Sequence, residues 1–319
     1  ELCRQIARYR PALLVLFERH ENSLYAIDLE LRGDFPQLKI QAVVGDVTVS
    51  QQVSDVFRAY APNVIFHAAA HKHVPMMEHN QVEAIRNNIM GTRTVGEAAL
   101  AAGVEHFVLI STDKAVNPTS VMGATKRVAE FLAQDLNGRG KTRFTVVRFG
   151  NVLGSSGSVV PRFMEQIRKG GPVTVTHPEI KRFFITIPEA VQLVLQASVL
   201  GRGGDVFVLA MGEQKRVADL ARDLIALSGH VQDIKIIYTG LRPGEKLYEE
   251  LFEEEEQVEP TAHEKINRAV GRLAFGPGEL DRHLRDLDVL LQTCDAEVAI
   301  KKLRELVPNY RMEPSDAAK

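Results

Sequence analysis

Two residue types are scarce in this sequence of 319 residues: it has no tryptophan and only two cysteines, Cys3 and Cys294. Two cysteines so far apart exclude a disulfide framework and a cysteine-based metal site, and they favour a reducing compartment. No run reaches the roughly 18 apolar residues of a membrane span, so we expect no membrane contact by these residues. Neither sign of charge dominates, because 39 Lys and Arg stand against 41 Asp and Glu, and this excludes a basic groove for nucleic acid.

The remaining composition is that of an ordinary globular protein, with 45% hydrophobic and 25% charged residues. The length allows one large domain or two medium ones. The sequence begins with Glu1 rather than Met, and a helical pattern starts there at once. We therefore expect that the natural protein extends upstream of Glu1.

Short apolar runs alternate with helical patterns along the first 150 residues. The predicted strands are 13–17, 40–44, 64–67, 107–110 and 144–149, and the predicted helices are 1–9, 24–31, 49–60, 80–102 and 120–137. Strands separated by helices form crossover units, and these build a mostly parallel sheet covered on both faces. The sequence predicts the α/β class, with a Rossmann-like, doubly wound dinucleotide-binding domain over 1–150.

The pattern loosens after Gly150. Short strands are predicted near 173–176, 183–186 and 206–209, and helices near 161–169, 188–200, 217–229, 277–292 and 296–306. No Ser/Gly-rich or Pro-rich spacer separates the two halves, so we expect 151–319 to form a smaller α/β substrate lobe and C-terminal helices, interleaved with the first domain. The acidic run 249–256 is interpreted as the solvated end of a helix.

The ends of three successive predicted strands carry residues that suit a dinucleotide. Glu18 can accept hydrogen bonds from a ribose diol, whereas Arg19 could instead meet a 2′-phosphate, so these residues leave NAD and NADP open. Asp46 could receive the adenine amino group. Small side chains, which let the backbone approach a dinucleotide closely, follow the third strand at Ala68, Ala69 and Ala70. Together these strand ends favour a nucleotide site over solvated surface residues.

A glycine-rich phosphate loop should lie between a first strand and the next helix, and these residues contain none. Either the protein lacks the loop, or the loop and the first strand lie upstream. The uncapped helical start at Glu1 favours the second interpretation, because a helix leaves amide groups unpaired at its N-terminus.

The densest group of polar residues follows the predicted strand 107–110. Thr112, Asp113 and Lys114 place a hydroxyl, a carboxylate and an ammonium within one turn, which can transfer protons next to a carbonyl. Met122 and Lys126 are four residues apart and share one face of the following helix. A polar turn capping a helix would use the same residue types. Taken with the strand ends, the cluster favours chemistry.

Several long motifs of the chain resemble those of the extended short-chain dehydrogenase/reductase superfamily. The chain is most similar to the polysaccharide-biosynthesis type of nucleotide-sugar 4,6-dehydratase, and specifically to the soluble catalytic domain of membrane-anchored UDP-N-acetylglucosamine 4,6-dehydratases. The resemblance covers residues 1 to about 270, and its matching segments are 16–31, 67–75, 87–92, 111–126, 147–154 and 240–251.

The resemblance implies a lyase that makes a UDP-4-keto-6-deoxy sugar for surface polysaccharide or glycan synthesis. Hydride leaves carbon 4 for a tightly bound NAD or NADP, with NAD favoured. Water is lost across carbons 5 and 6, and the hydride returns to carbon 6. We expect Asp113 to protonate the leaving hydroxyl and Lys114 to remove the proton on carbon 5. Burial and the charge of Lys126 should lower the pKa of Lys114. Lys126 should hold the nicotinamide ribose.

The superfamily's usual Tyr-x-x-x-Lys pair is here Met122 and Lys126. A thioether cannot deprotonate a sugar hydroxyl. The membrane-anchored dehydratases resemble this chain in carrying Met at that place, so the substitution supports the assignment. The role of the tyrosine must then pass to Thr112 or Asp113, and the sequence leaves that choice open.

The resemblance also implies further binding residues. Additional cofactor contacts are expected from Val47, Lys72, Asn88 and Ser111, and substrate contacts from His73, Asn151, Arg182, Arg216, Arg242 and Glu245. Arginines suit the two-pronged contacts that a diphosphate offers. His71, Lys72 and His73 lack supporting carboxylates or cysteines, so no metal site is expected.

Two other functions stay open at this point. An epimerase or reductase of the same superfamily would want Tyr at position 122, and a catalytically inactive nucleotide-sugar-binding domain would explain Met122 and the missing glycine loop. The resemblance further implies a cytoplasmic domain, anchored in the cell membrane by residues upstream of Glu1, that assembles as a homo-oligomer and takes a UDP-sugar as its partner.

Overall fold

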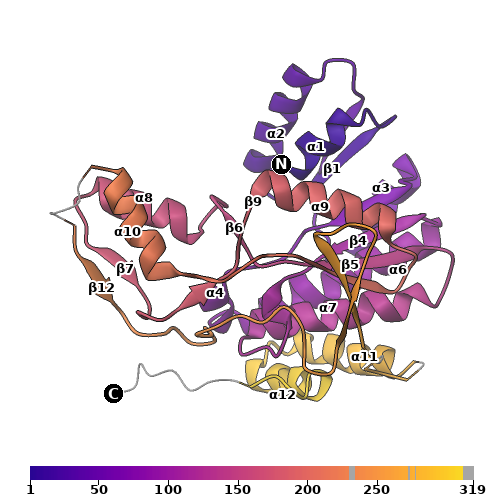
Figure 1. Cartoon of the computed structure of the whole chain (residues 1–319). Coiled ribbons are helices and arrows are strands. Elements are labelled where there is room, and N and C mark those ends of the chain that lie inside the picture. The colour runs from indigo at the N-terminus through magenta and orange to yellow at the C-terminus, as the bar shows by residue number, and fades with distance from the viewer. Residues whose placement is uncertain (230–233, 272–273, 277, 312–319) are drawn as a thin grey trace.

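A six-stranded sheet forms the centre of the fold in the computed structural model, which describes residues 1–229, 234–271, 274–276 and 278–311 (Figure 1). The strand order is β13 (Gln257–Pro260), β14 (Ile266–Val270), β10 (Asp205–Leu209), β5 (Arg143–Arg148), β4 (His106–Ile110) and β3 (Val64–His67). The four strands from β10 to β3 run parallel, and β14 and β13 are antiparallel additions at one edge. The predicted mostly parallel sheet is confirmed.

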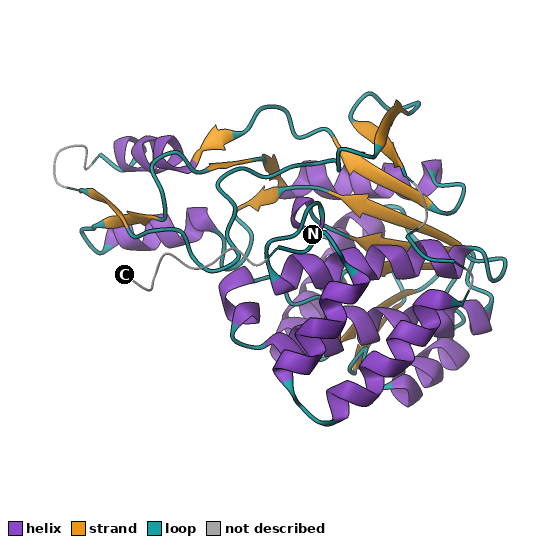
Figure 2. Cartoon of the chain, turned by 90° about the horizontal axis from the view of Figure 1, so that it is seen from below, coloured by secondary structure: helices purple, strands orange, loops and turns teal. Residues whose placement is uncertain are grey.

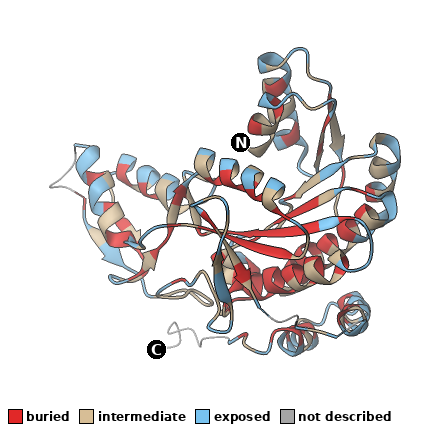
Figure 3. Ribbon diagram, turned by 45° about the vertical axis from the view of Figure 1, so that its right-hand side comes forward, coloured by how far each residue is buried: buried red, intermediate tan, exposed pale blue. Residues whose placement is uncertain are grey.

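Helices cover both faces of this sheet, as a doubly wound fold requires (Figure 2). Residues alternate along β4: Phe107 and Leu109 enter one hydrophobic core and Val108 enters another, because successive strand side chains point to opposite faces. The first core holds side chains of α3 (Ser50–Tyr60), α6 (Gly91–Ala102) and α7 (Val121–Asn137). The second holds those of α9 (Ile187–Leu200). The central strands and α7 are the most deeply buried elements (Figure 3).

The first two strands stand apart from the main sheet. β1 (Leu14–Glu18) and β2 (Ile40–Val44) pair with each other in parallel and form a separate two-stranded sheet. They have a small core of their own, to which α1 (Leu2–Arg8) and α2 (Glu21–Asp34) contribute. Within the described residues no ladder joins β1 or β2 to β3, so the sequence-based expectation of a single sheet is wrong for this pair.

The long helix predicted over 80–102 is interrupted in the middle. It consists of α5 (Gln81–Ile85), one turn of π-helix called η1 (Arg86–Met90), and α6. The wider turn buries Asn87 and Asn88. Such π-turns are rare and often occur at functional sites, and this one turns Asn88 towards the loop that follows β3.

The smaller lobe lies to one side of the sheet and contains α8 (Val159–Arg168), α10 (Val217–Leu227) and the parallel strands β7 (Val173–Val175) and β12 (Ile236–Tyr238) (Figure 1). Two short pairs connect it to the sheet: β6 (Asn151–Leu153) with β9 (Phe184–Thr186), and β8 (Lys181–Arg182) with β11 (Lys215–Arg216). The short helix α4 (Val74–Glu78) and the 3₁₀ turn η2 (Asp113–Ala115) complete the loops at the strand ends.

Two C-terminal helices, α11 (Glu279–Gln292) and α12 (Ala296–Leu306), form an additional layer outside α7 (Figure 1). Their buried leucines recur at helical spacing, for example Leu280, Leu284, Leu287 and Leu291, so one apolar face of the helix is covered. Within the described residues, no helix combines the length and the apolar character needed to cross a membrane.

Candidate active site

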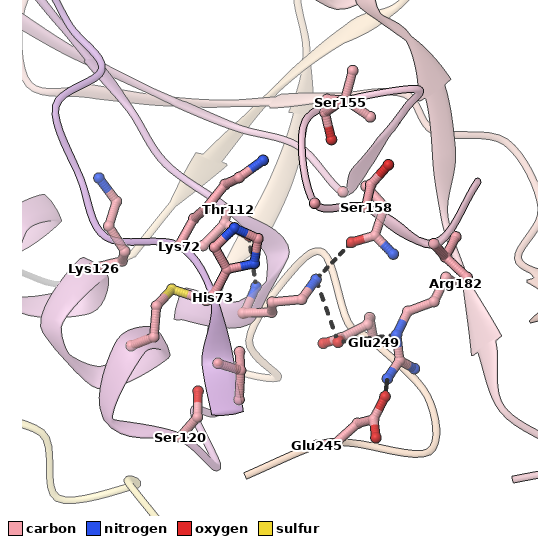
Figure 4. A pocket seen from close by; sticks show the side chains of 18 of the residues that line it. Lys72, His73, Thr112, Ser120, Lys126, Ser155, Ser158, Arg182, Glu245 and Glu249 are labelled. Atoms are coloured by element: carbon pink, nitrogen blue, oxygen red, sulfur yellow. Dashed lines mark hydrogen bonds and ion pairs between the residues drawn. The ribbon is translucent and has the colours of Figure 1, made fainter. Parts of the chain in front are cut away.

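A cavity of about 490 Å³ lies beyond the carboxyl ends of β4 and β5, between the sheet and the smaller lobe (Figure 4). In parallel sheets this is the edge where ligands bind. The cavity brings together most of the residues predicted from the sequence: Ala68, Ala70, Lys72, His73, Ser111, Thr112, Lys114, Met122, Lys126, Asn151, Arg182, Arg242 and Glu245. These residues come from positions 68 to 245 of the chain, and only folding makes them neighbours.

A second cavity of about 210 Å³ lies at the ends of β1 and β2. The predicted residues that line it are Glu18, Arg19, Val47, Ala68, Ala69 and Ala70. Ala68, Ala70 and His71 line both cavities, so the two adjoin along the loop after β3. Asn88 holds this loop in place, since its side chain accepts a hydrogen bond from the backbone amide of His71 and donates one to the His71 carbonyl.

Four predicted residues line neither cavity. Asp46 forms an ion pair with Arg19 at 3.3 Å and accepts a hydrogen bond from the Thr48 amide. Asn88 is buried under the loop, and Asp113 is enclosed. Arg216 is the clear outlier: its half-exposed side chain pairs with surface carboxylates of α10 and its vicinity, away from the cavity. The cavity therefore offers no contact with Arg216, because β11 presents that side chain to the outer surface.

Asp113 lies fully enclosed at the base of the larger cavity. Its Oδ1 accepts hydrogen bonds from Thr112 Oγ1 and Lys114 Nζ, each at 2.9 Å, while its buried Oδ2 has no hydrogen-bond partner among the described residues. Burial raises the pKa of Asp113, and the neighbouring Lys114 ammonium opposes that rise only in part. Asp113 can therefore hold a proton more readily than an exposed aspartate.

Two glycines allow this close packing. A Cβ atom on Gly150 would lie 2.8 Å from Phe183 Cβ and 3.1 Å from Asp113 Oδ2. A Cβ atom on Gly123 would lie 2.2 Å from the backbone oxygen of Lys114. The chain thus uses glycine where α7 and the loop after β5 press against η2, and this contact sets the position of Lys114.

Lys114 extends from η2 into the cavity and meets three acceptors. Its Nζ donates to Asp113 Oδ1 at 2.9 Å and to Asn151 Oδ1 at 3.0 Å, and it lies 3.4 Å from Glu249 Oε1. The prediction of a lowered pKa for Lys114 is wrong: burial does lower it, but the carboxylates of Asp113 and Glu249 outweigh burial and raise the pKa overall. Lys114 is held as an ammonium in this arrangement.

The pKa of Lys126, unlike that of Lys114, falls. Burial lowers it to about 8, and the Glu130 carboxylate opposes the change. Lys126 Nζ donates to the Ile110 carbonyl at 2.7 Å, and this contact holds the side chain at the cavity wall next to the end of β4. Met122 lies one turn earlier on α7 and also lines the cavity.

Glu249 is the site residue that sequence reasoning missed. The interpretation of 249–256 as a solvated helix end is wrong, because the segment contains no helix and the Glu249 side chain is only 3% exposed. Glu249 lines the cavity, and its Oε1 lies 3.6 Å from Arg182 Nε (Figure 4). Arg182 Nη2 also donates to Glu245 Oε1 at 3.3 Å.

A buried ion network anchors this acidic segment. Arg148 on β5 donates two hydrogen bonds to Glu130 of α7, at 2.9 and 2.8 Å, and two to Glu256, at 2.7 and 2.8 Å. Arg127 pairs with Glu130 and Glu253. The signal available in the sequence was Arg148 itself, since a charged residue in an apolar strand needs a carboxylate partner.

Comparison with known proteins gives consistent likenesses. The pattern of the family described as "Polysaccharide biosynthesis protein" matches residues 1–270. Capsular polysaccharide biosynthesis protein CapD of Staphylococcus aureus is 48% identical over 310 residues, which are 96% of this chain and 50% of that protein. The chain spans about half the length of this relative and of another at 51% identity.

Two further relatives carry enzyme names. UDP-N-acetylglucosamine 4,6-dehydratase (inverting) of Campylobacter jejuni is 36% identical over 248 residues, covering 76% of this chain and 70% of that protein. A UDP-glucose 4-epimerase of Rickettsia canadensis is 37% identical over 246 residues, with the same coverage. The X-ray structure of Pen from Bacillus thuringiensis matches with a TM-score of 0.78 and 34% identity, covering 86% of this chain and 84% of that one. These likenesses confirm the resemblance indicated by the sequence motifs.

Proposed function

The chain belongs to the polysaccharide biosynthesis protein family, and from that premise we propose that it catalyses the 4,6-dehydration of a UDP-N-acetylhexosamine. The expected substrate is UDP-N-acetylglucosamine, and the expected product is a UDP-4-keto-6-deoxy sugar for surface polysaccharide or glycan synthesis. The relative named as a UDP-N-acetylglucosamine 4,6-dehydratase supports this choice. A relative named as a UDP-glucose 4-epimerase is about equally similar, so sequence identity does not distinguish dehydration from epimerisation. The choice between the two reactions rests on the residues of the site.

One observation carries the proposal: the enclosed Asp113 is hydrogen-bonded to Lys114, which lines the cavity, and no tyrosine lines it in the described part of the chain. Epimerisation at carbon 4 requires a single acid–base group at the carbon 4 hydroxyl, and the tyrosine usually has this role. Dehydration also requires a base at carbon 5 and an acid at the carbon 6 hydroxyl. An acid with a raised pKa next to a lysine fits the second requirement.

Thr112 fits the role that the tyrosine leaves open. Its side chain lines the cavity and donates to Asp113 Oδ1 at 2.9 Å. A proton released by the carbon 4 hydroxyl can thus reach the enclosed Asp113 through the Thr112 hydroxyl, although Asp113 itself does not line the cavity. Asp113 then holds the proton that the leaving hydroxyl on carbon 6 needs.

The adjoining cavities fit a nicotinamide dinucleotide. Glu18 and Arg19 at the β1 end suit the adenosine half, the small side chains Ala68–Ala70 permit close approach in the middle, and Lys126 suits the nicotinamide ribose. When bound, the cofactor would take a hydride from carbon 4 and return it to carbon 6. The protein's residues supply the proton transfers and hold the sugar nucleotide.

We propose NAD rather than NADP. Glu18 accepts a hydrogen bond from the His20 amide at 2.9 Å, which holds its carboxylate beside the smaller cavity. The Arg19 guanidinium lies 3.3 Å from an oxygen of Asp46 and 3.6 Å from one of Glu83. The carboxylates of Glu18 and Asp46 at this end of the site would repel a 2′-phosphate.

Replacing Glu18 by Ala is expected to weaken NAD binding about tenfold and to reduce the preference for NAD over NADP, because the ribose loses an acceptor. Isothermal titration with each cofactor measures both effects. Glu21→Ala, on the exposed start of α2, is the matched control and should leave both affinities unchanged. Unchanged affinities in Glu18→Ala would contradict the assignment.

The substrate residues surround the far end of the larger cavity. Arg182, Arg242 and Glu245 come from β8 and from the loop after β12, and all three line the space next to Asn151. Two arginines there suit the diphosphate of the sugar nucleotide. We keep residues 151–319 as the proposed substrate-binding part of the chain, and His73 as a further proposed substrate contact.

The function is tested by incubating the purified protein, with any residues that precede Glu1 in its natural sequence, with UDP-N-acetylglucosamine and NAD. Mass spectrometry should detect a product lighter by one water. An epimerase would give a product of unchanged mass, and an inactive binding domain would give a complex without a product. Either of these two results would refute the proposed dehydration.

We also propose that the whole protein is a membrane-anchored homo-oligomer with this chain on the cytoplasmic side. One relative, from Methanocaldococcus jannaschii, is named an uncharacterized membrane protein, which supports an anchor outside residues 1–319.

A further inference from the structure

Three charged groups, the buried Asp113 and Glu249 and the partly buried Lys114, meet at one point of the cavity wall. Lys114 Nζ has an oxygen of Asp113 at 2.9 Å, of Asn151 at 3.0 Å and of Glu249 at 3.4 Å. The ammonium donates hydrogen bonds to Asp113 and Asn151, and the Glu249 carboxylate forms an ion pair with it. In the described structure Asp113 Oδ2 and Glu249 Oε2 are both buried without a hydrogen-bond partner. Each carboxylate therefore has one oxygen that accepts no hydrogen bond within the described residues.

This arrangement creates a chemical problem for dehydration. Lys114 can remove the proton on carbon 5 only as a neutral amine, yet its surroundings hold it as an ammonium. A proton must leave Lys114 before the elimination starts. Asp113 is an unsuitable acceptor at that moment, because it already holds the proton destined for the leaving hydroxyl.

Resting on the proposed dehydration, we propose that Glu249 is the temporary proton acceptor of Lys114 and so the third member of an Asp113–Lys114–Glu249 proton relay. Glu249 is 3% exposed, lines the cavity, and lies 3.4 Å from Lys114 Nζ. Asn151, the remaining neighbour of Lys114, is an amide and cannot take up this proton.

The proton balance closes over one turnover. Lys114 first passes a proton to Glu249 and becomes a neutral amine. The C5–H bond then breaks: its proton forms a new N–H bond on Lys114, its electron pair forms the C5–C6 double bond, and the C6–O bond breaks. The hydroxyl leaves as water with the proton from Asp113. Lys114 later returns its proton to carbon 5 and regains the proton held by Glu249.

Two cations lie close to Glu249 in the relay. Arg182 Nε lies 3.6 Å from Glu249 Oε1, and Arg182 is shared with Glu245. Lys114 faces Asp113, Glu249 and the more distant Arg182. Glu249 thus faces two cations, Lys114 and Arg182, and moving one proton from Lys114 to Glu249 leaves the net charge of the cluster unchanged.

The segment that carries Glu249 is fixed rather than free to move. Glu253 and Glu256, a few residues further along, pair with Arg127 and Arg148. Gln214 donates to the Glu249 carbonyl at 2.7 Å. These contacts hold the Glu249 carboxylate at its distance from Lys114, which a proton relay requires.

The test is Glu249→Gln, which keeps the shape of the side chain but cannot take up the proton. At pH 7 the dehydration of UDP-N-acetylglucosamine should fall about 100-fold, and so should the incorporation of deuterium at carbon 5 in heavy water. The variant lacks one of the carboxylates that raise the pKa of Lys114, so the lost rate should recover in part as the pH rises and Lys114 releases its proton to solvent. The wild-type rate should change little over the same range.

Glu250→Gln is the matched control, since Glu250 is the next residue, is exposed, and pairs with Lys246 instead of the relay. It should keep the wild-type rate and pH profile, and thermal unfolding should show that both variants are folded. If Glu249→Gln lost activity equally at every pH, Glu249 would only support the structure. If it were as active as wild type or more active at pH 7, no proton acceptor would be needed, and the relay would be wrong.

The two proposals fail in different ways. If the wild-type protein releases no water from UDP-N-acetylglucosamine, the proposed function is refuted, and so is the relay that rests on it. A wild-type protein that dehydrates the sugar, together with a Glu249→Gln variant that does so with the wild-type pH profile, refutes the relay alone.

Discussion

Replacing Asp113 by Asn is expected to lower the rate of dehydration by about 10²–10⁴-fold. Asp113 is enclosed, burial raises its pKa, and it is the acid assigned to the leaving hydroxyl. An asparagine of the same shape has no proton to give. Because Asp113 does not line the cavity, the dissociation constant of the sugar nucleotide should change little. Steady-state kinetics and isothermal titration measure the two quantities separately.

Asp55→Asn on the exposed face of α3 is the matched control and should retain the wild-type rate. In the Asp113→Asn variant Lys114 keeps Asn151 and Glu249 as partners, so the fold should survive. Full activity in Asp113→Asn would mean that another group, such as Thr112, protonates the leaving hydroxyl. A variant that binds no sugar nucleotide would mean that Asp113 shapes the cavity and is not its acid.

Replacing Arg148 by Met is expected to lower the free energy of unfolding by about 3–5 kcal/mol, because it leaves buried carboxylates without their cation. Arg148 and Glu130 are both fully buried, and Arg148 joins Glu130 of α7 to Glu256 of the acidic segment. The ion pairs lower the pKa of Glu130 to about 2, although burial alone would raise it. Urea unfolding followed by circular dichroism measures the loss.

Two further variants test whether the loss of stability comes from the ion network or from packing in general. Arg58→Met, on the exposed side of α3, should change the free energy of unfolding by less than about 0.5 kcal/mol. The combined variant Arg148→Met, Glu130→Gln and Glu256→Gln should recover part of the lost stability, since no uncompensated buried charge remains. If Arg148→Met were as stable as wild type, the cluster would not anchor the acidic segment.

Much of the fold could be predicted because its signals are local. An apolar run such as 107–110 or a helical repeat such as that in 120–137 is a property of neighbouring residues, and both elements appear in the structure as β4 and α7. The sequence patterns did not predict β13 (Gln257–Pro260) or β14 (Ile266–Val270). These short, partly polar strands acquire their conformation only by pairing at the sheet edge, β14 with β10 and β13 with β14.

The residues of the candidate site also fall into two groups, those that local sequence signals predict and those that only the fold brings into the site. Residues at the ends of predicted strands, such as Glu18 and Thr112, could be found because parallel strands present their carboxyl ends at one edge. Glu249 could not, since an acidic run in sequence gives no sign of which of its carboxylates turns inward. Its contacts with Lys114 and Arg182 join residues 135 and 67 positions away, and only the folded chain brings them together.

The sequence by itself determined the α/β class, the order of most strands and helices, and the motif with Thr112, Asp113 and Lys114, because these depend on spacing and residue type along the chain. Only the tertiary structure decided the protonation of the site. The approach of Asp113 and Glu249 raises the pKa of Lys114 where the sequence predicted a fall, whereas burial lowers that of Lys126 although the Glu130 carboxylate opposes the change. The physical reason is that a pKa depends on the distance to other charges and to water, and both are set by folding.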